Sequence, residues 1–210
     1  MIRLPTDPAG WASADLDPAV AWLRAGNVVA LPTDTAYGLS ADPTSEAAVQ
    51  RVFDVKERPA GLALPLIAGS LQQVEALCGP LTGLNARLAA RFWPGPLSLV
   101  LDAPLAVASR VHGGRRSIAI RVPAHPVARR LCLAWGGCLT ATSANRSGEQ
   151  EAISADQLGP LSSDARVLVV DAGPAPGGPP STIVDARGTT MALVRAGAIA
   201  WDRVLRSLEE

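Results

Sequence analysis

Apolar and polar residues alternate along this chain with two different periods. Several segments repeat their apolar residues with the 3.6-residue period of a helix, whereas residues 28–31 and 167–170 are short apolar runs typical of buried strands. Strict alternation over residues 117–122 indicates a strand with one apolar face. Helices and strands are therefore interspersed along the chain, which favours an α/β fold.

Capping and stop residues give bounds for the expected elements. Asp17 before Pro18 is expected to cap a first helix that stops at Gly26, and Thr44 or Ser45 to cap the second. Ser70 and Thr82 are expected to cap two later helices. The expected helices are 18–26, 45–58, 70–79, 82–93, 125–137 and a short one before residue 210. The expected strands are 28–31, 94–101, 115–122 and 166–173, with a further one in 138–148 that ends near Ser143 and Asn145. Residues 33–35 are expected in a loop where the first strand ends at Pro32.

Lys56 is the only lysine among nineteen basic residues. It lies in the last turn of the helix 45–58, on the same stripe as Val49, Val52 and Phe53, so it is expected to point toward the core. One interpretation is an ammonium required at a functional site. The other is a cation that complements the helix dipole and extends from an apolar face.

Composition and charge exclude several classes of protein. With 210 residues, 48% apolar content and zero formal net charge, the chain is expected to be one domain over residues 1–210 without a global attraction to nucleic acid or membranes. The proline-rich stretch 173–180 is expected to be a loop within that domain, not a linker. Residues 1–10 lack a signal-peptide pattern and no apolar run approaches eighteen residues, so we expect a soluble, cytoplasmic protein.

Cysteine and histidine are too few for several kinds of site. Cys78, Cys132 and Cys138 form no C-x-x-C pair, which argues against a disulfide framework or structural zinc. The only histidines are His112 and His125, and no G-x-S-x-G motif is present. We therefore expect no protein-held metal and no Ser/His/Asp hydrolase.

Short hydroxyl residues and single cations gather near the ends of the expected strands. They are Thr33, Thr35, Lys56, Arg58, Ser117, Arg121, Ser143, Asn145, Ser181 and Arg195. Such a set suits an anionic ligand such as a nucleotide, although the chain has neither a P-loop nor a G-x-G-x-x-G motif. The alternatives are an ordinary solvated sheet face for Ser117 and Arg121, and an ordinary Asx or Ser turn for Ser143 and Asn145.

Six segments in order resemble the YrdC-like family of threonylcarbamoyl-AMP synthases, in its short bacterial form. They are LPTDTAYGLSADP, VKERP, SIAIRVP, TATSANRSG, STIVD and LVRAGAI. The resemblance implies a twisted, mixed, open sheet flanked by helices, with a central positively lined cavity. It also implies that Lys56 and Arg58 of the K-x-R motif, and Ser143 and Asn145 of the S-x-N motif, form the core of the site. The further positions that match contacts to threonine or nucleotide are Thr35, Ser117, Arg121, Thr142, Ser181 and Arg195.

The activity implied by the resemblance is the formation of L-threonylcarbamoyladenylate and pyrophosphate from L-threonine, bicarbonate or CO2, and ATP with Mg²⁺. The product serves tRNA threonylcarbamoyladenosine modification through a downstream transferase complex. Lys56 is then expected to meet a phosphate or carbamate oxygen as a compact charge. Residues 60–69 depart from the family pattern because they are wholly apolar, and they are candidates for packing against the substrate methyl group or the adenine.

Two other functions remain open from the sequence. A module that binds double-stranded RNA or tRNA, or assists ribosome maturation without turnover, could use Arg115 and Arg116, although zero net charge disfavours this as the main role. Carbamoyl transfer in hydrogenase maturation uses a related domain, but those proteins are much longer.

Overall fold

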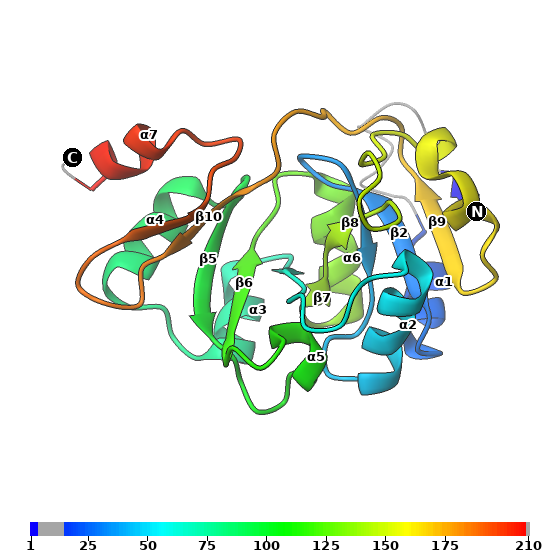
Figure 1. Ribbon diagram of the computed structural model, residues 1–210, viewed down its shortest axis with the longest axis horizontal. Helices are drawn as coiled ribbons and strands as arrows, with labels where there is room; N and C mark the ends of the chain where they lie inside the picture. Colours follow the sequence, from blue (N-terminus) through cyan, green and yellow to red (C-terminus); the bar gives the residue numbers. More distant parts are fainter. Residues whose placement is uncertain (4–14, 209–210) are drawn as a thin grey trace.

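The computed structural model describes residues 1–3 and 15–208, and its strands form two mixed sheets (Figure 1). Most of residues 1–10, in which no signal-peptide pattern is found, and the terminal Glu209 and Glu210 lie outside the described residues. The five-stranded sheet contains, in spatial order, β1 (Ile2–Arg3), β9 (Val167–Asp171), β2 (Val28–Pro32), β3 (Tyr37–Ser40) and β8 (Thr142–Ser143). The six-stranded sheet contains β11 (Ala192–Arg195), β10 (Thr182–Asp185), β5 (Leu97–Asp102), β6 (Ser117–Arg121), β4 (Leu66–Ile67) and β7 (Leu139–Thr140).

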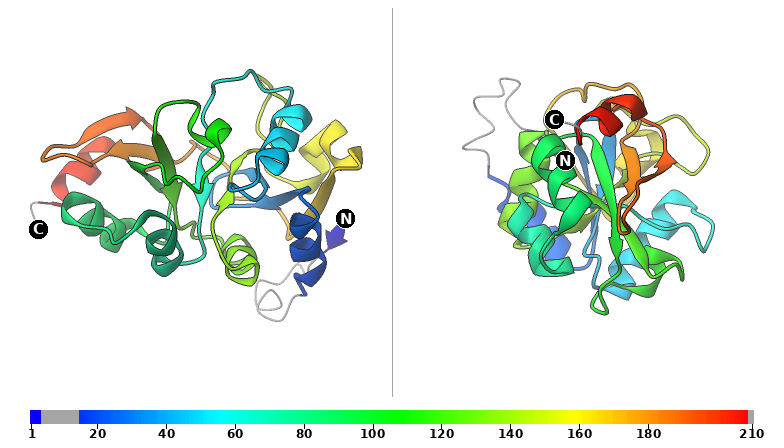
Figure 2. Two further views of the ribbon diagram at one scale, coloured as in Figure 1. Left: turned by 90° about the horizontal axis from the view of Figure 1, so that it is seen from below. Right: turned by 90° about the vertical axis from the view of Figure 1, so that its left-hand side faces the viewer.

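Helices cover the two sheets mainly from one side. Figure 2 shows α1, α3, α4 and α6 together on one side, with α2 on the other. The helices are α1 (Asp17–Arg24), α2 (Glu46–Lys56), α3 (Leu71–Cys78), α4 (Gly83–Phe92), α5 (Ser109–His112), α6 (Pro126–Trp135) and α7 (Trp201–Arg206), with a kinked 3₁₀ segment at Ala155–Ser163. Among the described residues, no helix has the length and apolar character needed to cross a membrane.

Most of the expected caps are confirmed, with one correction. The Ser45 and Ser70 side chains accept hydrogen bonds from backbone N–H groups at the starts of α2 and α3, as N-caps do. Thr82 occupies the cap position of α4 without a side-chain hydrogen bond. Asp17 is the first residue of α1 and not its cap, because the preceding Leu16 is drawn into the core.

The expected mixed α/β fold is confirmed, with its strands divided between two mixed sheets, and the segment 138–145 explains the division. Its residues Leu139–Thr140 pair with β4 in the six-stranded sheet, whereas Thr142–Ser143 pair with β3 in the five-stranded sheet. Only Ala141 separates the two short strands, and its N–H donates to the Pro65 carbonyl at 2.8 Å. One segment therefore joins both sheets and brings their edges together.

A common core supports both sheets. The larger hydrophobic cluster includes Tyr37 and Leu39 of the five-stranded sheet and Leu99 and Ile120 of the six-stranded sheet, all of them fully buried. The strand β3 was not expected from the sequence; it pairs antiparallel with β2, so residues 33–36 form the turn of a hairpin. The sheets thus hold this turn in a fixed position beside β8.

Candidate active site

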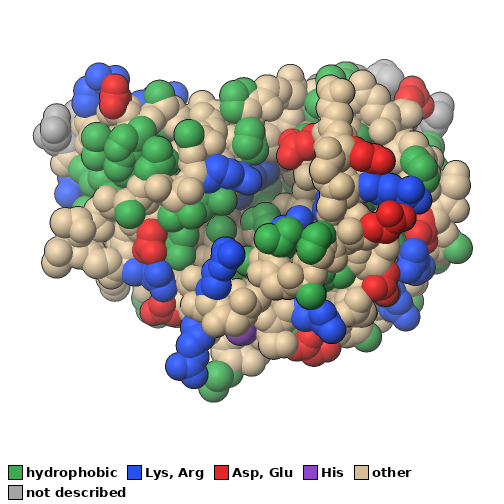
Figure 3. Space-filling view, viewed as in Figure 1, with side chains coloured by type: hydrophobic (Ala, Val, Ile, Leu, Met, Phe, Trp, Pro, Cys, Tyr) green, Lys and Arg blue, Asp and Glu red, His purple; other side chains and the backbone are tan. Residues whose placement is uncertain are grey.

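A cavity of about 460 Å³ lies where the two sheets meet, and residues from both sheets line it. Figure 3 shows it as a hollow in the middle of the molecular face, with basic and apolar side chains at its edge. The described residues that line it include Arg58, Arg115, Arg121, Arg187 and Arg195. Of these, Arg187 is already bound to Asp102 and Asp185 at 2.9 and 2.7 Å. Most of the charged residues that line the cavity are thus arginines, which suits an anionic ligand.

The hairpin turn between β2 and β3 forms one wall of the cavity. The Thr33 hydroxyl donates to the Ala36 carbonyl at 2.8 Å and lies 3.2 Å from the Thr35 hydroxyl. Both threonines are buried and both line the cavity. The expected loop at the carboxyl end of the first strand is confirmed, and its hydroxyl groups stand next to the ligand space.

Arg121 of β6 is held against this turn by a buried ion pair. Its Nη2 atom lies 3.0 Å from Oδ1 of Asp34 and 3.2 Å from the Thr33 hydroxyl, and both side chains of the ion pair are only 8% exposed. The other carboxylate oxygen of Asp34 accepts from the Ala124 N–H at 3.1 Å. The Nε atom of Arg121 is buried without a hydrogen bond among the described residues. Arg121 therefore lines the cavity as a cation whose position is set by Asp34 and the hairpin turn.

The face of β6 that carries Arg121 borders the cavity along its length. Ser117 and Ala119 line the cavity on the same side of the strand, and both are only partly buried. The small Ala119 side chain leaves space between the serine and the arginine, as the alternation indicated. This face is therefore the wall of a cavity and not an ordinary solvated sheet face.

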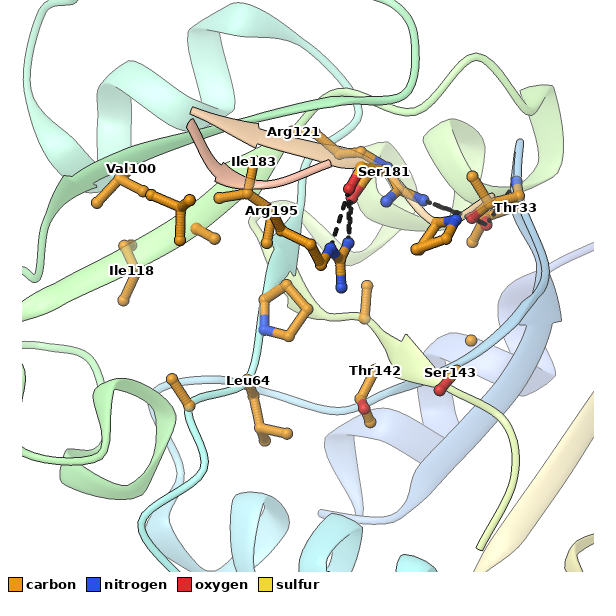
Figure 4. Close-up of a pocket in the computed structure, with 18 of the residues that line it drawn as sticks. Thr33, Leu64, Val100, Ile118, Arg121, Thr142, Ser143, Ser181, Ile183 and Arg195 are labelled. Carbon is orange, nitrogen blue, oxygen red and sulfur yellow. Dashed lines mark hydrogen bonds between the residues drawn. The ribbon is translucent and has the colours of Figure 1, made fainter. Parts of the chain in front are cut away.

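A second arginine is fixed in the wall of the cavity, on the edge strand β11. Arg195 donates from Nη2 to both the carbonyl and the hydroxyl of Ser181, at 2.7 and 2.9 Å. The Ser181 hydroxyl also lies 3.0 Å from that of Ser98 on β5. Figure 4 shows the Arg195 guanidinium directed into the cavity, toward the side that carries Thr142 and Ser143.

Lys56 lies beneath the S-x-N turn and is almost completely buried, with 1% of its surface exposed. Its ammonium donates to the Ser143 carbonyl, to the Asn145 carbonyl at 2.7 Å and to Asn145 Oδ1 at 2.8 Å. An ammonium has three donors, so all of them are used within the protein. The expectation that Lys56 points toward the core is confirmed, but here it contacts the turn rather than the cavity.

The S-x-N turn is further braced by its own side chains. The Ser143 hydroxyl donates to Asn145 Oδ1 at 2.7 Å, and Asn145 Nδ2 donates to the Glu149 carbonyl at 2.6 Å. Thr142 and Ser143 line the cavity, whereas Asn145, like Lys56, is not among its lining residues. Of the four residues expected at the core, only Ser143 and Arg58 border the cavity; Lys56 and Asn145 support the turn behind it.

Arg58 follows α2 and crosses toward the cavity. Its Nη2 atom donates to the Ala63 carbonyl at 2.9 Å, which anchors the segment that leads to β4. Ala63, Leu64 and Pro65 of this segment line the cavity. Part of the apolar stretch 60–69 therefore borders the ligand space.

Burial, and for two of them a neighbouring positive charge, lowers the pKa of three cations at the site, Lys56, Arg58 and Arg195. Burial, and secondarily the nearby Arg58 guanidinium, lower the pKa of the Lys56 ammonium to about 8, against the opposing effect of Glu151. Burial also lowers the pKa of Arg58, and burial together with Arg121 lowers that of Arg195. Positive groups in this state are stabilised by a bound anion, which is typical of functional sites.

The lowered pKa of Lys56 leads to a prediction about pH. Below about pH 8 the ammonium keeps three donors for its three acceptors, whereas above it the neutral amine has two donors and a lone pair that faces a carbonyl oxygen. We expect the rate of the reaction at this site to fall as the pH rises through about 8. A rate profile at saturating substrate checks this; a rate unchanged up to pH 9.5 would contradict it. Replacing Glu151 by glutamine should move the decline to lower pH.

The cavity has a polar end and an apolar end. Figure 4 shows Val100, Ile118 and Ile183 together on one side and Thr33, Thr142 and Ser143 on the other. All three apolar residues belong to the six-stranded sheet. This arrangement accommodates a ligand with a flat apolar part and a charged part.

Some residues of the site were not expected from the sequence. Asp34 is separated from Arg121 by 87 positions, so no local pattern reveals their ion pair, although its place between two threonines was a signal. Arg115, from the sequence a candidate for RNA contact alone, lines the cavity. Glu151 had no expected role and is one of two described acidic residues that line the cavity, the other being Asp185. Among the described residues, no group of three or more His, Cys, Asp or Glu side chains is arranged to hold a metal ion.

Comparisons with known proteins identify relatives of this chain. The family model Sua5/yciO/yrdC, described as "Telomere recombination", matches residues 21–197. The chain is 39% identical over 165 residues to a threonylcarbamoyl-AMP synthase of Thiobacillus denitrificans, a match that covers 79% of this chain and 87% of the relative.

Solved structures show the same fold. The structure of Pyrococcus abyssi Sua5 complexed with L-threonine matches with a TM-score of 0.87 and 32% identity, covering 99% of this chain and 59% of Sua5. E. coli YciO matches over 97% of both chains with a TM-score of 0.81 and 24% identity, which bears on the fold alone. The chain thus spans about three fifths of Sua5 but nearly the full length of the shorter relatives.

Proposed function

The chain belongs to the Sua5/YciO/YrdC family, and on that premise we propose that it is a threonylcarbamoyl-AMP synthase, an adenylyl transferase. It forms L-threonylcarbamoyladenylate and pyrophosphate from L-threonine, bicarbonate or CO2, and ATP. Its relatives of 34–39% identity carry the name of this enzyme, and one related structure was solved with L-threonine.

The observation that carries the proposal is the division of the cavity. The apolar end with Val100, Ile118 and Ile183 offers a surface for adenine, and the polar end with Arg121 and Arg195 offers charge to phosphate and carboxylate groups. A volume of about 460 Å³ is within the range of small-molecule sites. Apolar residues of the segment 60–69 close the same space, which supports their proposed packing against the adenine or the substrate methyl group.

The proposed reaction needs alignment more than proton transfer. The ammonium of threonine first loses a proton to water, and the resulting amine attacks the carbon of bicarbonate. The nitrogen–carbon bond forms, a carbon–oxygen bond breaks, and water leaves. A carbamate oxygen then attacks the α-phosphorus of ATP, and the bond to pyrophosphate breaks. Arg58, Arg121 and Arg195 offset the charge of the two anions, which otherwise repel each other.

The hydroxyl groups around the cavity orient the substrates. Thr35, Thr142, Ser143 and Ser181 present oxygens from both sheets, and Ser117 does so from the start of β6. Lys56 and Asn145 act from behind by holding the turn that carries Ser143. In this proposal Thr33 belongs to the site by fixing the hairpin turn on which Thr35 and Asp34 stand.

The proposal also covers the metal ion, the use of the product and the extent of the domain. ATP enters with Mg²⁺, which the triphosphate and water mainly hold, in keeping with the preference of Mg²⁺ for phosphate oxygens. The product serves tRNA modification in the cytoplasm and passes to a threonylcarbamoyl transferase complex. We treat residues 1–210 as one domain with the loop 173–180 inside it, because Pro180 and residues of both sheets line one cavity.

Release of pyrophosphate tests the function. ATP and Mg²⁺ are supplied with threonine and bicarbonate, singly and together, and release that requires both is the expected result. Serine in place of threonine is a control for the amino acid. If no combination releases pyrophosphate from folded protein, the assignment is overturned. An affinity for RNA that falls steeply as the salt concentration rises would then favour an RNA-binding module. The exposed Arg115 and Arg116 would mediate that binding.

A further inference from the structure

Glu151 stands out because it is an acidic residue on the wall of a cavity built for anions. The other described acidic residue that lines the cavity is Asp185, whose carboxylate is bound to Arg187 at 2.7 Å. Glu151 is partly buried, and among the described residues no hydrogen bond or ion pair satisfies its carboxylate. Its charge is therefore available to a ligand.

The backbone on both sides holds Glu151 in place. The Glu149 carbonyl accepts from Asn145 Nδ2 at 2.6 Å, and the Ala152 carbonyl accepts from the Tyr37 N–H on β3 at 2.8 Å. The S-x-N turn thus anchors one side of the residue and the five-stranded sheet the other. The backbone around Glu151 is thereby held beside the cavity that its side chain lines.

The carboxylate also lies within electrostatic reach of the cations of the site. Glu151 raises the pKa of both Lys56 and Arg195, which lie behind the S-x-N turn and across the cavity respectively. It does not neutralise either by direct contact. Its negative charge therefore acts on the part of the cavity near Arg195 and Ser143.

An unpaired carboxylate disfavours every anionic group of the substrates. ATP, bicarbonate and the carboxylate of an amino acid would each be repelled at this position. The substrates bring only two cationic groups, the ammonium of the amino acid and the Mg²⁺ that accompanies ATP. A single carboxylate suits an ammonium, with which it forms a charge-assisted hydrogen bond, whereas Mg²⁺ is held largely by phosphate oxygens and water.

We propose that Glu151 binds the ammonium group of the amino acid substrate. This inference rests on the proposed function. It makes Glu151 the residue by which the cavity distinguishes an amino acid from a molecule of the same shape that lacks the amino group. The Glu151 carboxylate places the nitrogen near Ser143 and Arg195, and these polar groups remain available to the substrate's anionic oxygens. Glu151 is thus a specificity-determining residue of the cavity.

Binding measured without ATP or bicarbonate tests the inference apart from turnover. Calorimetry compares L-threonine with 3-hydroxybutyrate, which lacks the amino group. The unaltered protein is expected to prefer threonine, and Glu151→Gln to lose about tenfold in threonine affinity with little change for 3-hydroxybutyrate. Glu149→Gln is the matched control, because Glu149 is exposed on the same loop and does not line the cavity.

The other outcomes overturn the inference in distinguishable ways. Equal losses for both ligands would show that Glu151 only shapes the cavity. Unchanged threonine affinity with a raised Mg²⁺ requirement for pyrophosphate release would assign the carboxylate to the metal ion. Absence of threonine binding by the unaltered protein would overturn the proposed function itself, and this inference with it.

Discussion

Replacing Lys56 by arginine should lower the rate of pyrophosphate release about 100-fold, even though the positive charge is kept. The Lys56 ammonium reaches three oxygens of the S-x-N turn, two of them carbonyls and one the Asn145 side chain. A guanidinium is planar and larger, so its donors do not converge on one point as those of an ammonium do. The turn would lose its support, and Ser143 would be displaced from the cavity.

Two variants of Lys56 and one control separate the effect of geometry from that of charge. Lys56→Arg and Lys56→Met should both lose activity to a similar extent, because neither supplies three converging donors. Arg146→Met is the control: Arg146 lies on the same loop in an exposed ion pair with Glu57 at 3.2 Å, and such pairs contribute little. A Lys56→Arg variant with most of the original rate would show that charge alone is needed and would contradict a role in holding the turn.

Replacing Asp34 by alanine should lower the free energy of unfolding by about 3–5 kcal/mol. Asp34 and Arg121 form an ion pair in which each side chain is 8% exposed. Without Asp34 the Arg121 charge stays buried, and no ion pair offsets the free-energy cost of removing this guanidinium from water. The Ala124 N–H loses its acceptor as well.

Urea unfolding of single and double variants measures this effect. Asp34→Ala/Arg121→Met should recover most of the lost stability, since it leaves no unpaired charge, yet its rate of pyrophosphate release should stay about 100-fold low because Arg121 is missing. Asp164→Ala is the control, as its ion pair with Arg166 is more exposed. A loss below 1 kcal/mol for Asp34→Ala would show that water enters and solvates Arg121.

Local patterns predicted individual elements well. The stripe shared by Lys56 and the apolar residues of α2 follows from helical geometry alone, and the caps at Ser45 and Ser70 follow from side-chain chemistry. Such features depend on residues three or four positions apart. The sequence near Lys56 therefore contains enough information to predict its burial.

Features that depend on residues far apart in the sequence could not be predicted from local patterns. The division into two sheets depends on β4 and β7, which have two residues each and show no period that could be recognised. The acceptors of Lys56 lie 87 and 89 positions away, so burial was predictable but its partners were not. The expected cavity and most of its candidate residues came from resemblance to a family, and Glu151 had no counterpart in that resemblance.

The single residue between β7 and β8 limits how this chain can vary in length. Ala141 is bound to Pro65, while its neighbours on either side pair with different sheets. An insertion here would shift Thr142 and Ser143 relative to β4 and turn alternate side chains to the opposite face. By contrast, the loop between β5 and α5, where Leu105 is fully exposed, has room for added residues. Insertions and deletions among natural variants of this chain should therefore accumulate in that loop and be excluded around Ala141, which a survey of their lengths would reveal.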